Sequence, residues 1–139
     1  MEGYLDATRA ELLFSRGVIF VEGPAAEVLL PGFAAAAGHN LDERGLTICS
    51  VDGINFAPYV RMAELLSLPY SVLTDWDPID GKVPLGWART QELVLDIRRA
   101  RGLKELSKDQ LNKLSSDQGV LQTVAVKYGI FLNSSMQIF

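Results

Sequence analysis

The stretch VIFVEGP, residues 18–24, decides the fold class of this chain. Its four consecutive apolar residues, three of them β-branched, come directly before Glu22, Gly23 and Pro24. A continuous apolar run of this length is typical of a strand buried on both faces, as in a parallel sheet. Pro24 suits the first turn of a helix. The stretch therefore predicts a buried strand that ends in a glutamate, followed by a helix over residues 25–37.

Further strands and helices alternate along the rest of the chain. The expected strands cover residues 46–51 (LTICSV), 70–74 (YSVLT) and 129–132 (GIFL). The other expected helices cover residues 7–15, 58–66, 85–101, 107–114 and 117–127, with Ser107 as an N-cap. Strands that alternate with helices at this spacing indicate βαβ units. We therefore expect an α/β fold with a mostly parallel four-stranded sheet flanked by helices.

Acidic residues follow three of these strands. Glu22 ends the first, Asp52 the second, and Asp75 and Asp77 the third. Reactive residues gather at the carboxyl ends of strands in such sheets. A carboxylate cluster without His or Cys ligands suits Mg²⁺ or Mn²⁺, and one or two such ions can hydrolyse a phosphodiester bond. The simpler explanation is that these aspartates form turns.

Composition limits the other possibilities. The chain has 139 residues, enough for one domain, and a net charge of −4 with a pI near 4.9. A nucleic-acid-binding domain usually has a basic face, so bound metal ions or another part of the protein would have to supply positive charge. No apolar stretch reaches membrane-spanning length, and the lone Cys49 fits a reducing compartment. We expect a cytoplasmic protein.

Four segments resemble the TOPRIM domain of the OLD (overcoming lysogenisation defect) family. Residues 18–31, VIFVEGPAAEVLLP, are similar to its first motif, and residues 70–78, YSVLTDWDP, to its second. Residues 50–59, SVDGINFAPY, resemble the segment between the motifs, and residues 127–133, KYGIFLN, resemble the next strand. The order and spacing of these segments agree with the family.

The resemblance implies a Rossmann-like TOPRIM fold and a metal-dependent DNA endonuclease. Residues 1–139 would form a single TOPRIM domain, a C-terminal fragment of a longer chain that also carries an ABC-type ATPase domain. Glu22 would be a metal ligand or general acid/base, and Asp75 and Asp77 would bind Mg²⁺ (or Mn²⁺). DNA would be the substrate, and a homodimer is one of the assemblies left open.

Each of the other candidate ligands has an alternative structural role. Family members carry a second glutamate four residues after the first, where this chain has Ala26, with Glu27 one residue further on. One residue is about 100° of rotation on a helix, so we favour Glu27 as a solvated carboxylate over a metal ligand. Asp52 is a better turn residue than ligand, and Thr74 either supplies an oxygen or fills the strand end.

Lys82 and Arg89 follow the acidic loop and could contact DNA phosphates, although a solvated helix face explains them more simply. Three functions remain open: a metal-dependent endonuclease, a non-catalytic TOPRIM assembly or regulatory module whose metal site is degraded at Ala26, and a receiver-like domain. The last ranks lowest, because neither the third nor the fourth strand ends in a lysine.

Overall fold

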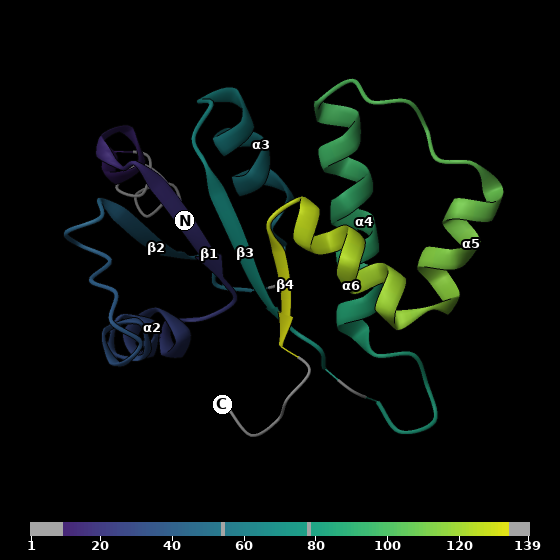
Figure 1. Cartoon of the computed structure of the whole chain (residues 1–139), viewed down its shortest axis with the longest axis horizontal. Helices are drawn as coiled ribbons and strands as arrows, with labels where there is room; N and C mark the ends of the chain where they lie inside the picture. Colours follow the sequence, from purple (N-terminus) through teal and green to yellow (C-terminus); the bar gives the residue numbers. More distant parts are fainter. Residues whose placement is uncertain (1–9, 54, 78, 134–139) are drawn as a thin grey trace.

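The computed structural model describes residues 10–53, 55–77 and 79–133. Its sheet has four strands in the order β2-β1-β3-β4, and every pair is parallel (Figure 1). The strands are β1 (Gly17–Val21), β2 (Leu46–Ser50), β3 (Tyr70–Asp75) and β4 (Ile130–Asn133). The predicted α/β fold is confirmed, and each strand boundary falls within about a residue of the expected one.

The helices also lie where the sequence predicts them. They are α2 (Pro24–Ala36), α3 (Ala57–Leu65), α4 (Leu85–Ala100), α5 (Lys108–Ser116) and α6 (Gln118–Lys127). Ser107 caps α5, because its side chain accepts a hydrogen bond from the Gln110 backbone N–H. Of the helix expected over residues 7–15, residues 10–14 are helical and residues 7–9 lie outside the described residues.

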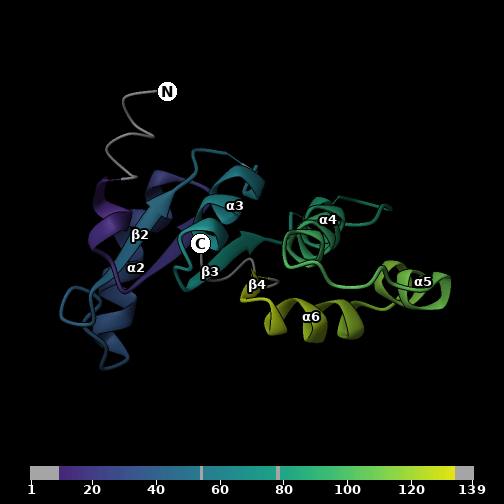
Figure 2. The same ribbon diagram turned by 90° about the horizontal axis from the view of Figure 1, so that it is seen from above.

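The helices are unevenly distributed around the sheet. Figure 1 shows α2 beside the β1 and β2 side of the molecule, whereas α4, α5 and α6 lie beyond β4. Seen from above in Figure 2, α3 and α4 lie next to each other, and α5 is at the end of the molecule opposite α2. No residue of α2 is fully buried. No helix in the described part of the chain is long and apolar enough to cross a membrane.

The core is built on the two central strands. Phe20 of β1 and Val72 of β3 are completely buried. The Phe20 ring packs against Tyr59 of α3, with ring centroids 5.9 Å apart, and against Tyr70, at 6.3 Å. Cys49 of β2 is also buried in this core. This packing holds β1 and β3 rigidly side by side.

The register between β1 and β3 places the carboxyl ends of the two strands side by side at one edge of the sheet. Val21, the last residue of β1, is paired with Leu73 of β3. The next residues along the two strands are Glu22 and Thr74. Because parallel strands end at the same edge of a sheet, the residues after β1 and at the end of β3 become neighbours.

Candidate metal centre at the carboxyl edge of the sheet

The Glu22 carboxylate is held against the end of β3. Its Oε1 accepts a hydrogen bond of 2.5 Å from the Thr74 hydroxyl and one of 3.2 Å from the Asp75 backbone N–H. Thr74 is only 3% exposed, so its hydroxyl is fixed by the surrounding packing. The Thr74 hydroxyl therefore orients the Glu22 carboxylate, a role that differs from both of those expected for Thr74.

Arg89 of α4 bridges the carboxylates of this edge. Its Nη2 atom lies 2.5 Å from Asp77 Oδ2 and 3.5 Å from Glu22 Oε1, and it donates a hydrogen bond of 3.0 Å to the Asp75 carbonyl. The Arg89 side chain is 16% exposed, compared with 19% for Glu22 and 41% for Asp77. The expectation of a solvated helix face is therefore wrong for Arg89, because the acidic loop folds over the start of α4 and encloses the guanidinium.

The environment of Glu22 favours its protonated form. Burial raises the pKa of Glu22, and the negative charge of Asp75 raises it further. The Thr74 hydroxyl, the Asp75 backbone N–H and the Arg89 guanidinium lower the pKa, but they do not cancel the effect of burial.

A glycine allows α4 to approach the end of β3. The Gly86 N–H donates to the Trp76 carbonyl at 3.1 Å, and the Leu85 N–H donates to the Asp77 carbonyl at the same distance. A Cβ atom on Gly86 would lie 2.3 Å from the Asp75 carbonyl oxygen, far inside van der Waals contact. The close approach places Arg89, one turn further along α4, beside the carboxylates.

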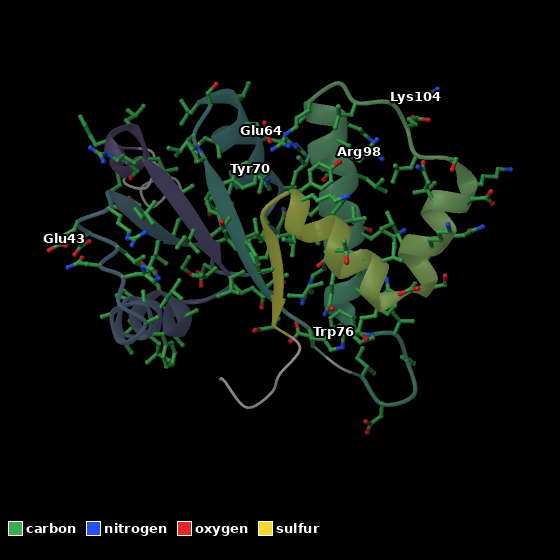
Figure 3. All side chains as sticks on the ribbon, viewed as in Figure 1. Glu43, Glu64, Tyr70, Trp76, Arg98 and Lys104 are labelled. Atoms are coloured by element: carbon green, nitrogen blue, oxygen red, sulfur yellow. The ribbon has the colours of Figure 1, made fainter. Side chains whose placement is uncertain are left out.

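The loop between the two aspartates is fixed by aromatic packing. The Trp76 ring packs on Trp87 of α4, with centroids 5.7 Å apart. Figure 3 shows Trp76 at the opposite end of β3 from Tyr70. Asp77 adopts a left-handed conformation, with φ of 46°, which turns the chain back toward α4.

The remaining candidate site residues are not among the side chains that contact Arg89. Asp52 is exposed, with φ of 54°, in a turn where the Gly53 N–H donates to the Glu22 carbonyl at 2.8 Å. Glu27 lines a hollow of about 770 Å³ together with residues of β2 and the end of α2, and Glu22 is not among its lining residues. Lys82 is exposed in a turn, where its N–H donates to the Ile79 carbonyl.

The donor chemistry fits a hard cation, but the arrangement is that of an ion-pair cluster. Within residues 10–53, 55–77 and 79–133, no three His, Cys, Asp or Glu side chains are placed so that they could hold a metal ion together. Glu22 and Asp77 instead share the Arg89 guanidinium. Sequence reasoning offered Arg89 as a DNA contact or as part of a solvated helix face, and nothing in its spacing from Asp77 indicates the ion pair.

Comparisons with known proteins find similarity to OLD proteins and to an endonuclease. Residues 13–77 match the family model for the overcoming lysogenization defect protein-like TOPRIM domain. A stretch of 68 residues, 49% of this chain, is 32% identical to Endonuclease GajA of Bacillus cereus (strain HuB5-5). The C-terminal region of the Burkholderia pseudomallei OLD protein is 37% identical and superposes with a TM-score of 0.71 over 88% of this chain. The platinum-phased C-terminal region of the Xanthomonas campestris pv. campestris OLD protein is 33% identical, with a TM-score of 0.70 over 92% of this chain.

The matched region is only part of these relatives. The chain spans 10% of the length of Endonuclease GajA, and 56% and 54% of the two OLD chains. The family match covers both β1 with Glu22 and β3 with its two aspartates, and the structural matches extend over most of the chain. The chain has the fold of the C-terminal region of OLD proteins, and its residues 13–77 are similar to the OLD-like TOPRIM domain.

Proposed function

We propose that this chain is the metal-binding nuclease domain of a DNA endonuclease. The observation that carries the proposal is the placement of Glu22, Asp75 and Asp77 at one edge of an OLD-like TOPRIM sheet, two of them on the same guanidinium. A similar protein is named an endonuclease. In this proposal the substrate is DNA, and the bond that breaks is a phosphodiester.

Glu22, Asp75 and Asp77 would hold one or two Mg²⁺ or Mn²⁺ ions. A bound ion of this kind activates water and stabilises the leaving oxygen of a phosphodiester. The Thr74 hydroxyl keeps the Glu22 carboxylate oriented toward the edge of the sheet. The raised pKa of Glu22 suits a group that exchanges protons during a reaction, because a carboxyl of ordinary pKa is fully ionised at neutral pH.

Other parts of the proposal concern partners. Lys82 is exposed next to the acidic loop, where it could neutralise a DNA phosphate. The net charge of −4 leaves most of the DNA-binding surface to another segment, and we propose that this includes an ABC-type ATPase domain of the same protein. Since the single Cys49 is a buried thiol, we place the activity in the reducing cytoplasm.

A second candidate is a non-catalytic TOPRIM module that serves assembly or regulation. Ala26 stands where the family has its second glutamate, and Glu27 lines a hollow that Glu22 does not line. These two observations favour a weakened metal site. The two candidates differ in metal affinity, which can be measured directly.

The test is calorimetric titration of Mn²⁺ into wild type and into a D75A/D77A double variant. A D42A/D109A variant is the matched control, since it removes two exposed carboxylates distant in the fold from β3. The nuclease proposal expects binding in wild type and in the control, no binding in D75A/D77A, and metal-dependent plasmid cleavage by the full-length protein. Absence of binding in all three would favour the non-catalytic module.

A further inference from the structure

Arg89 is connected to the carboxyl edge more tightly than a DNA-contacting side chain needs to be. A single nitrogen, Nη2, lies within 3.5 Å of three oxygens, and these come from the end of β1, the end of β3 and the loop after β3. The side chain is 16% exposed. A guanidinium in this position is well placed to neutralise carboxylates and poorly placed to reach a phosphate in solution.

We propose that Arg89 is a built-in cation of this site, which neutralises the carboxylates in the absence of metal and must leave them when a divalent cation binds. The inference rests on the proposed metal-binding function and adds a competitor to it. Glu22, Asp75 and Asp77 would repel one another if they were crowded together without a positive charge. Arg89 removes that repulsion, and for the same reason it opposes the entry of a second cation.

In its present position the Arg89 side chain has one N–H donor without an acceptor among the described residues. Its Nε atom is buried and has no hydrogen-bond partner among the described residues. The hydroxyl of the adjacent Thr90, which is 1% exposed, is also buried and without a partner in this part of the chain. The guanidinium is therefore held from one side only, by the oxygens of the carboxyl edge.

Space for a displaced guanidinium adjoins the site. A cavity of about 100 Å³ is lined by Arg89 itself, by Thr90, and by Glu92 and Asp96 of the same helix. Glu92 lies three residues beyond Arg89, so the two side chains project from one face of α4. A guanidinium that leaves Glu22 and Asp77 can meet acidic side chains again on its own helix.

The competition predicts that loss of the guanidinium improves metal binding. In calorimetric titrations, R89Q should bind Mn²⁺ about tenfold more tightly than wild type, the scale expected for removing a charge 4–6 Å from an ionised site. R99Q is the matched control, because Arg99 lies on the same helix with a side chain that is 70% exposed. R99Q should bind Mn²⁺ as wild type does. When a chelator keeps the metal away, R89Q should unfold at a lower temperature than wild type and R99Q. Saturating Mn²⁺ should remove that difference in unfolding temperature.

Any other result of the Mn²⁺ titrations counts against the inference. Equal or weaker Mn²⁺ binding by R89Q, beside clear binding by wild type, would overturn the competition and leave the metal site standing. No binding by either protein would overturn the metal site and the competition together. If R89Q does not fold, Mg²⁺ can be added to isotope-labelled wild type: the Arg89 Nε–H resonance should shift while that of Arg99 does not. An Arg89 signal that is unchanged at saturating Mg²⁺ would overturn the inference.

Discussion

The Thr74 hydroxyl donates a 2.5 Å hydrogen bond to Glu22 Oε1 and thereby links the ends of β3 and β1. The two residues are 52 positions apart in sequence, and parallel register alone makes them neighbours. The bond fixes which way the Glu22 carboxylate faces. It also supplies a donor that stabilises the ionised form of Glu22.

Replacing Thr74 with valine keeps the shape of the side chain and removes that donor. We expect T74V to raise the pKa of Glu22 further, because the Thr74 hydrogen bond lowers it, and to lower the free energy of unfolding by about 1–2 kcal/mol. An NMR titration of the Glu22 carboxyl carbon and urea unfolding measure the two effects. T123V, which removes an exposed hydroxyl from α6, should change stability by less than about 0.5 kcal/mol. A Glu22 titration identical in T74V and wild type would contradict the role assigned to Thr74.

The raised pKa of Glu22 makes stability depend on pH. Because the folded chain binds a proton at Glu22 more readily than the unfolded chain, the contribution of Glu22 is complete below its unfolded pKa and is lost as the pH rises through the raised value. E22Q carries no such proton. We therefore expect the unfolding free energy of E22Q, relative to wild type, to increase from mildly acidic to neutral pH.

Urea unfolding at a series of pH values measures this difference. E105Q, which changes an exposed glutamate away from the cluster, should follow the wild-type profile. If the difference between E22Q and wild type were constant with pH, or fell as the pH rose, Glu22 would not have the environment described for it.

Replacing Gly86 with alanine tests the packing between α4 and β3. In G86A the new methyl group would lie 2.3 Å from the Asp75 carbonyl oxygen, so the helix has to move. We expect a loss of about 1–3 kcal/mol in unfolding free energy, together with a weaker Arg89 contact to the carboxylates. G119A is the control, since a Cβ there meets only Asp117 Oδ1, at 3.4 Å. Because alanine favours helix formation, G119A should be neutral or stabilising by up to about 1 kcal/mol. Equal effects of the two variants in thermal unfolding would argue against the close approach of α4.

At the opposite end of β3, Tyr70 allows a test that does not involve the metal site. Burial raises the pKa of Tyr70, and Glu64, which accepts a 2.8 Å hydrogen bond from its hydroxyl, raises it further. In E64Q the negative charge is gone, so Tyr70 should ionise at a lower pH than in wild type. Ultraviolet titration of phenolate absorbance measures this, and Y70F identifies which of the tyrosine signals is Tyr70. An unchanged titration in E64Q would mean that Glu64 does not contact Tyr70 in solution.

Much of the fold follows from local sequence patterns. The apolar run at residues 18–21 predicts β1 because a strand buried on both faces needs no alternation of polar residues. Pro24 and Ser107 mark the starts of helices through the constraints on their own backbone and side chain. Glu22, Asp75 and Asp77 could be assigned to one edge because parallel strands end together.

The arrangement inside that edge could not be predicted in the same way. Arg89 has no sequence feature that separates it from the exposed Arg99, and its position depends on how closely α4 approaches β3. That approach depends on Gly86, whose missing side chain has meaning only once the neighbouring backbone is in place. Interactions between elements that are distant in sequence set the ion pairs, so single-sequence patterns leave them undetermined.

The all-parallel strand order has a consequence for folding kinetics. Every strand pair in the described sheet is parallel, so no two consecutive strands in it form a hairpin, and β1 must close long loops to pair with both β2 and β3. Sheets built from such distant pairings fold slowly, because loop-closure entropy is lost before the contacts form. The Glu22 cluster exists only after β1 and β3 have joined. A divalent ion that binds there should therefore prolong the lifetime of the folded chain by slowing its unfolding, while leaving the rate of refolding almost unchanged.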